Sequence, residues 1–77
     1  MTSHFTLDIS QSEMVNLFNN SVLNIREYRK EGDSFFIEIR HNEETNGKEL
    51  VAKEVTRLNL TANINEYQLP ELCKRYW

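Results

Sequence analysis

Two alternating segments joined by a short turn limit what this chain can fold into more than any other feature. Residues 23–30 alternate between two sets of side chains, residues 31–34 read EGDS, and Phe35, Ile37 and Ile39 then occupy every second position. Gly, Asp and Ser favour turns, and successive side chains of a strand point to opposite faces. The sequence therefore predicts a β-hairpin whose apolar face must be covered by another element.

The segment before the hairpin predicts a strand followed by a helix. Residues 5–9 alternate apolar and polar side chains, as a short half-buried strand does. Ser10 and Glu13 have the spacing of a capping box, in which each side chain satisfies a backbone N–H of the other residue. We expect a helix over about residues 11–20.

The apolar residues of this helix predict how it packs. Met14, Leu17 and Phe18 recur at helical intervals, and Val22 continues the same row beyond the end of the helix. An apolar stripe of this kind packs on the apolar face of a sheet. The N-terminal helix is therefore expected to cover one face of the sheet.

Residues Lys48–Leu60 fit two patterns. Read as a helix, Val51, Val55 and Leu58 form a stripe. The preceding Asn46-Gly47 pair is typical of a tight hairpin turn, and the segment contains several β-branched residues, both of which favour a strand. We adopt the strand and keep the helix as the alternative.

The last element is expected over Glu66–Trp77. Pro70 suits a first helical turn, and Lys74 and Arg75 complement the negative end of a helix, so the tail predicts a short C-terminal helix. The predicted fold is α+β, in the order β-α-β-β-β-α, with an antiparallel sheet. No repeat or Gly/Pro-rich linker interrupts the chain, so residues 1–77 are predicted to form one small domain.

Sorting the strands by face predicts a basic surface on a chain whose net charge is −3. The face opposite Phe35 would hold five basic residues and one acidic residue, a local net charge of +4, together with two aromatic rings. If Lys48–Leu60 is a helix, Lys53 and Arg57 leave this face and its net charge falls to +2. The predicted contact residues are Arg26, Tyr28, Lys30, Phe36, Arg40, Lys53 and Arg57. The alternative, which we favour slightly, is that the charges only solvate and protect an exposed sheet face and that Phe36 packs under the tail helix.

A second predicted contact lies in the tail. Tyr76 and Trp77 are large aromatic side chains of the kind enriched at interface hot spots. They make a homodimer through the tail one of two interpretations, and it is the less favoured one. The alternative is that the tail folds back and seals the small core.

The residues that usually carry catalysis or bind a metal are few and scattered. His4, His41 and Cys73 have no ligand-like spacing, and Cys73 is expected near a helix C-terminus, which does not activate a thiol. Gly32 and Gly47 are isolated, so no phosphate-binding loop is present. We expect a non-enzymatic protein without a metal or cofactor.

The compartment follows from two sequence features. A single cysteine cannot form an internal disulfide, and neither a signal peptide nor an apolar run of about 18 residues is present. These features predict a cytoplasmic protein without a membrane span.

The predicted function is a small binding or regulatory protein that acts by protein–protein contact. It would be a phage- or mobile-element-type inhibitor or adaptor of a larger host complex. The alternative is a single-stranded nucleic-acid-binding domain that uses the basic and aromatic sheet face.

Overall fold

Four strands and two helices, in the order β-α-β-β-α-β, make up residues 1–67, which are the residues that the computed structural model describes. The strands form one antiparallel sheet in the order β2-β3-β1-β4. This is the split βαβ, or ferredoxin-like, arrangement. The elements are β1 (Thr2–Asp8), α1 (Gln11–Asn20), β2 (Asn24–Glu31), β3 (Ser34–Arg40), α2 (Gly47–Arg57) and β4 (Asn63–Tyr67). The predicted α+β class and antiparallel sheet are confirmed.

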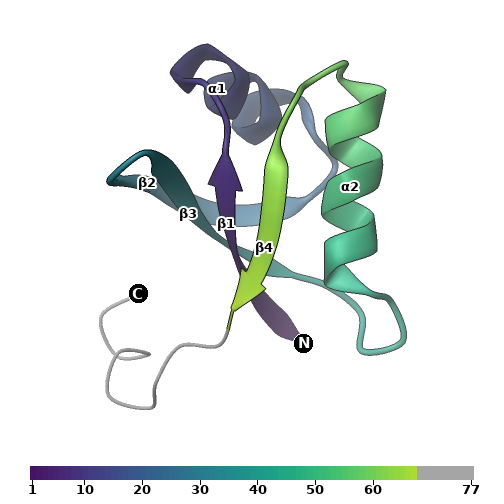
Figure 1. Cartoon of the computed structure of the whole chain (residues 1–77). Coiled ribbons are helices and arrows are strands. Elements are labelled where there is room, and N and C mark those ends of the chain that lie inside the picture. Colours follow the sequence, from purple (N-terminus) through teal and green to yellow (C-terminus); the bar gives the residue numbers. More distant parts are fainter. Residues whose placement is uncertain (68–77) are drawn as a thin grey trace.

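Both helices pack on the same face of the sheet, α1 near β2 and α2 beside β4 (Figure 1). The register of β1 explains why this face is apolar. Phe5 lies opposite Ile37 and Leu7 lies opposite Phe35, so these side chains project to the same side. One core results, formed by buried side chains from β1, the β1–α1 connection, β3 and both helices: Phe5, Leu7, Ile9, Met14, Leu17, Phe35, Ile37, Ile39, Val51 and Val55.

The start of α1 is the predicted capping box. The Ser10 Oγ accepts the Glu13 backbone N–H at 3.3 Å, and the Ser10 N–H donates to the Glu13 carboxylate at 3.4 Å. Met14 and Leu17 are buried on the sheet. The predicted helix and its packing are therefore confirmed.

The predicted strand over Lys48–Leu60 is wrong, because most of this segment belongs to the helix α2 (Gly47–Arg57). The Asn46 side chain accepts the backbone N–H groups of Lys48 and Glu49, at 3.0 and 3.4 Å, and so caps the helix. Gly47 is buried in the first turn, where a Cβ would lie 2.9 Å from the His41 Nε2. Asn46 thus caps a helix, and Gly47 allows its first turn to approach His41 closely. The alternative prediction, a helical stripe of Val51, Val55 and Leu58, is the one that packs on the core.

The predicted C-terminal helix over Glu66–Trp77 overlaps β4 at its start. Glu66 and Tyr67 are the last two residues of that strand, paired with β1. The predicted order is therefore wrong after its fourth element. The fifth element is the helix α2, where a strand was predicted, and the strand β4 follows it. The rest of the predicted helix, including Tyr76 and Trp77, lies outside the described residues.

A β-bulge in β2 breaks the alternation that the sequence suggests. The pairing of β2 with β3 shifts between Ile25 and Tyr28, so that two residues, Arg26 and Glu27, lie opposite the single residue Glu38. Strict alternation would place Ile25 and Tyr28 on opposite faces. The bulge places both on the face that the helices cover, where they pack against the core.

Candidate functional site

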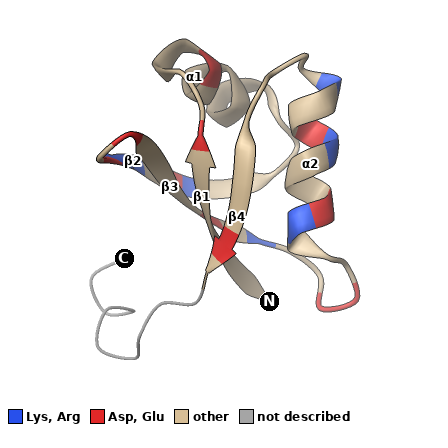
Figure 2. Ribbon diagram, viewed as in Figure 1, with Lys and Arg blue, Asp and Glu red and all other residues tan. Residues whose placement is uncertain are grey.

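The predicted basic face does not form, because the bulge and α2 distribute its residues over three surfaces. Tyr28 packs beside Phe35 on the helix-covered face, with ring centroids 5.9 Å apart. Lys30, two residues further along β2, belongs to the same face. Lys53 and Arg57 belong to α2, and Arg26 lies in the bulge. Figure 2 shows basic and acidic positions interspersed along α2 and the hairpin.

The outer face, meaning the sheet face turned away from α1 and α2, keeps Phe36 and Arg40 of the predicted contact residues, together with Arg26 in the bulge opposite Glu38. Its charged strand residues are mostly acidic. The register places three cations there, those of Arg26, Arg29 and Arg40, against four carboxylates, those of Asp8, Glu27, Glu31 and Glu38. The predicted segregation of positive charge is therefore wrong.

Aromatic rings gather on the outer face all the same. The Phe36 and Tyr67 rings meet edge to face with centroids 5.1 Å apart, and the His4 ring lies 6.0 Å from that of Tyr67. The Arg29 guanidinium lies over the Phe36 ring, 5.5 Å from its centroid. Beside them, Glu38 is only 7% exposed, and its Oε2 accepts no hydrogen bond from any described residue.

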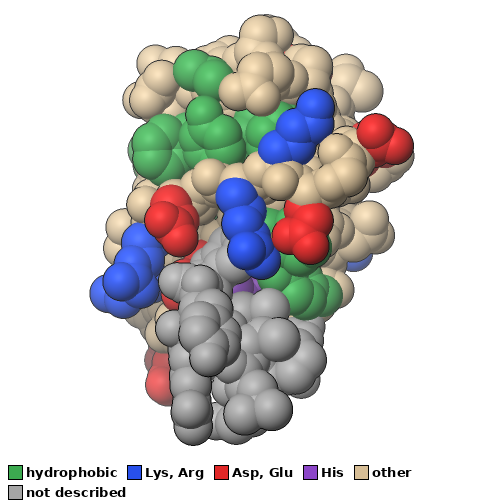
Figure 3. Space-filling model, turned by 90° about the vertical axis from the view of Figure 1, so that its left-hand side faces the viewer, with side chains coloured by type: hydrophobic (Ala, Val, Ile, Leu, Met, Phe, Trp, Pro, Cys, Tyr) green, Lys and Arg blue, Asp and Glu red, His purple; other side chains and the backbone are tan. Residues whose placement is uncertain are grey.

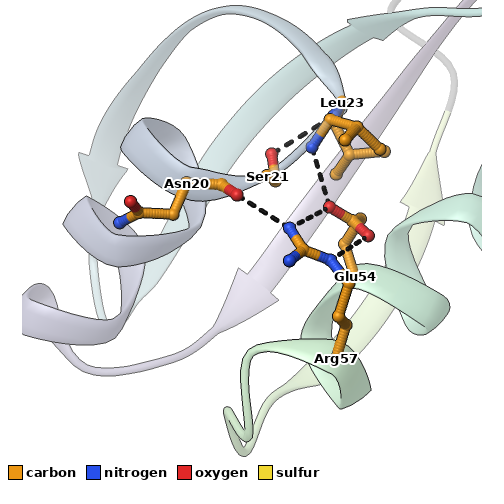
Figure 4. A network of polar contacts seen from close by, with 6 residues as sticks. Asn20, Ser21, Leu23, Glu54 and Arg57 are labelled. Atoms are coloured by element: carbon orange, nitrogen blue, oxygen red, sulfur yellow. Dashed lines mark hydrogen bonds and ion pairs between the residues drawn. The ribbon is translucent and has the colours of Figure 1, made fainter.

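A second cluster joins the two helices (Figure 4). The Glu54 carboxylate accepts the Arg57 Nε–H and Nη2–H, both at 2.9 Å, and the Val22 backbone N–H at 2.7 Å. Arg57 also donates to the Asn20 carbonyl at 2.7 Å, at the end of α1. The Arg57 hydrogen bonds, and then the Val22 N–H, lower the pKa of Glu54, and the same pairing raises the pKa of Arg57.

The Glu54 cluster determines how Val22 is presented. The Val22 backbone N–H donates to the carboxylate of Glu54, a residue that is only 6% exposed, whereas Val22 itself is 85% exposed. Val15 and Phe18 are each 37% exposed, and Phe18 packs edge to face on Tyr28, with centroids 5.1 Å apart. We call Val15, Phe18 and Val22 the α1 row.

Hydrophobic side chains gather in the upper part of the side shown in Figure 3, at the height of α1. Phe18 and Val22 were predicted to belong to the stripe that packs on the sheet, and the exposure of Val15 was not predicted. One signal could have revealed the row. Apolar residues at 14, 15, 17, 18 and 22 span more of the circumference of a helix than one buried stripe needs.

Charge is almost absent from α1. Of its ten residues only Glu13 is charged. The Glu13 carboxylate accepts the Thr61 N–H at 3.0 Å and the Ser10 hydroxyl at 2.7 Å, and these hydrogen bonds lower its pKa. By contrast, α2 has five charged residues among eleven, namely Lys48, Glu49, Lys53, Glu54 and Arg57.

His41 makes polar contacts near the start of α2. The Ser3 Oγ lies 2.8 Å from the His41 Nε2, and the His41 Nδ1 lies 2.8 Å from the Asn42 carbonyl. A carbonyl only accepts, so in the neutral ring Nδ1 carries the proton and Nε2 accepts from the Ser3 hydroxyl. Both side chains pack against Gly47 and so fix where α2 begins.

Residues 1–67 contain no group of three or more His, Cys, Asp or Glu side chains placed to hold a metal ion. Neither of the two described helices is long and apolar enough to cross a membrane. In comparisons with known proteins, no protein family, no curated protein and no solved structure matches this chain.

Proposed function

We propose that this chain is a non-enzymatic domain that works by binding another protein, and that the α1 row is the contact. The observation that carries the proposal is the exposure of Val22, whose backbone is anchored by Glu54 while its side chain faces water. Large apolar side chains that stay exposed beside a fully formed core are typical of protein-binding surfaces. Together with Phe18, Val22 gives such a surface an aromatic and an aliphatic anchor.

Two further features support this proposal. The centres of interfaces are depleted in charged residues, and α1 has one charged side chain, which is hydrogen-bonded to Ser10 and Thr61. The row is also held rigidly, because the capping box fixes one end of α1 and Arg57 fixes the other. A rigid contact surface loses little conformational entropy on binding.

A domain of this size can act by occupying a site on a larger complex, as an inhibitor or an adaptor does. A cytoplasmic setting belongs to the same proposal, since the chain has a single cysteine. The phage- or mobile-element origin stays a prediction, based on the brevity of the chain and its many asparagines.

Site-specific photocrosslinking tests the contact. The photoreactive residue p-benzoylphenylalanine replaces Val15 or Val22 in the full chain, and the matched control carries it in place of Lys53 on the exposed side of α2. We expect both row positions to give the same crosslinked protein and the control to give none. Equal yields from all three positions, or adducts from the control alone, would contradict the proposal.

A second candidate function rests on the outer face. Phe36, Tyr67 and His4 lie together there with Arg29, and four-stranded sheets bind single-stranded RNA by stacking bases on such rings. Two observations make this function less favoured than protein binding. Arg29 already covers the Phe36 ring, and carboxylates outnumber cations on this face. Fluorescence anisotropy with labelled single-stranded RNA and DNA at two salt concentrations decides, because absence of binding at low salt eliminates this function.

A further inference from the structure

We infer that residues 68–77 bind to the outer face of their own chain, where Lys74 and Arg75 supply a cation to the buried carboxylate of Glu38. The inference concerns the sheet face turned away from α1, so it does not rest on the proposed function. Three observations support it: a carboxylate oxygen of Glu38 that no described residue satisfies, the point at which the chain leaves β4, and the composition of residues 68–77.

Glu38 is a buried carboxylate in the middle of the sheet. It belongs to β3, one of the two interior strands, and only 7% of the residue is exposed. No described residue donates a hydrogen bond to its Oε2, and none of the ion pairs within residues 1–67 includes it. A carboxylate that is withdrawn from water without a partner is strongly destabilising. A cation from outside residues 1–67 is therefore expected to pair with Glu38.

Residues 68–77 begin close to Glu38. His4 of β1 lies opposite Glu38 of β3 on one side and opposite Tyr67, the last residue of β4, on the other. The three residues thus form a row across the outer face, and since neighbouring strands are about 4.8 Å apart, Tyr67 lies about 10 Å from Glu38. Lys74 and Arg75 follow Tyr67 by seven and eight residues. Because an extended residue spans about 3.3 Å, both cations can reach Glu38.

The composition of residues 68–77 complements that of the outer face. The segment contains two cations and one carboxylate, whereas the face holds three cations and four carboxylates. The segment also contains Tyr76 and Trp77, and the face carries the edge-to-face rings of Phe36 and Tyr67, against which further aromatic rings pack favourably. Because the segment is attached at this face, its effective concentration there is of millimolar order, so a weak contact suffices.

This contact also bears on the second candidate function. Residues 68–77 would occupy the rings on which single-stranded RNA needs to stack its bases. The α1 row lies on the other side of the sheet and would stay open to a partner protein.

A spin label on Cys73, the single cysteine of the chain, tests the contact without a substitution. In NMR spectra of the full, isotope-labelled chain, the nitroxide should broaden the amide signals of β1 and β3 around His4 and Glu38 more strongly than those of α1 and α2. Dilution with an excess of unlabelled chain excludes contacts between copies. Broadening as strong on α2 as on β3, or none on either, overturns the inference.

A double-mutant cycle tests the ion pair. Lys74→Ala together with Arg75→Ala should lower the urea midpoint of the parent chain, because Glu38 loses its cation, and should have little effect in a Glu38→Gln background. The matched control, Lys48→Ala with Lys53→Ala on the exposed side of α2, removes the same charge and should give equal changes in both backgrounds. If the loss of Lys74 and Arg75 lowers the midpoint equally in both backgrounds, the pairing with Glu38 is wrong. Neither experiment involves the α1 row, so the outcome is independent of the proposed function.

Discussion

The two helices lie on the same sheet face and are nearly equal in length, yet their outer sides differ. The exposed side of α2 carries Lys53 paired with Glu49, an exposed ion pair at 3.7 Å. The exposed side of α1 carries Val15 and Phe18, and Val22 follows directly after the helix. Both helices bury two aliphatic or Met side chains in the same core. The folding of this domain therefore explains the inner sides of both helices and the outer side of α2, but not the outer side of α1.

The largest expected effect separates the two sides of α1. Leu17→Ala should destabilise the domain by about 3 kcal/mol, because Leu17 is fully buried and its truncation leaves a cavity. In so small a domain that is most of the stability, and the variant should unfold at much lower urea. Phe18→Ala, one residue away and 37% exposed, should cost about 1 kcal/mol or less and reduce photocrosslinking to the partner from position 22 instead. Equal urea midpoints for the two variants would contradict the division of α1 into two sides.

The next effect concerns the connection between the helices. Glu54→Ala removes the acceptor of the Val22 N–H and leaves Arg57 with the Asn20 carbonyl alone. An unsatisfied N–H in a partly buried position costs about 2 kcal/mol, so the urea midpoint should fall clearly. If the variant is as stable as the parent chain, then Glu54 does not hold the end of α1.

Local signals explain why α1 and the hairpin could be predicted. The capping box of Ser10 and Glu13 lies within four residues, and the turn at 31–34 is equally local. The start of α2 is different. Asn46-Gly47 suits both a hairpin turn and a helix cap, and the choice depends on Gly47 packing against Ser3, more than 40 positions earlier in the sequence.

The candidate site was harder to predict than the fold, for a similar reason. A bulge is defined by how a strand pairs with its partner, so the residues of β2 alone do not predict the shift between Ile25 and Tyr28. That one shift moves Tyr28 and Lys30 to the other face, and together with the placement of Lys53 and Arg57 in α2 it removes the predicted basic surface. The exposure of Val22 was also hidden, because it depends on a hydrogen bond to Glu54 from 32 positions away.

Acid should weaken both ends of α1. Hydrogen bonds lower the pKa of Glu13 and of Glu54 from the ordinary value of 4.5, so the unfolded chain takes up protons at higher pH than the folded one. Their contribution to stability is complete above about pH 4.5 and is lost as the pH falls through their folded values. Urea midpoints measured from neutral pH downward should decline in that window.

Two variants test which carboxylate causes this loss of stability in acid. Glu54→Gln should flatten the dependence on pH, because it removes the titrating group that binds Arg57 and Val22. The matched control is Glu49→Gln, which removes a carboxylate from an exposed ion pair on α2 and should change the slope less. If Glu49→Gln flattens the profile as much as Glu54→Gln, the loss in acid comes from overall charge and not from α1.

The smallest expected effect tests the outer side of α2. Lys53→Ala removes the ion pair with Glu49, and both side chains are more than 60% exposed. Pairs of this kind contribute about 0.3 kcal/mol and are screened by salt, so the urea midpoint should barely move. The yield of photocrosslinking from position 22 should not change either, because Lys53 is not part of the α1 row. If Lys53→Ala instead abolished association with the partner, the contact surface would have to extend over α2, and the low charge of α1 would no longer distinguish the two helices.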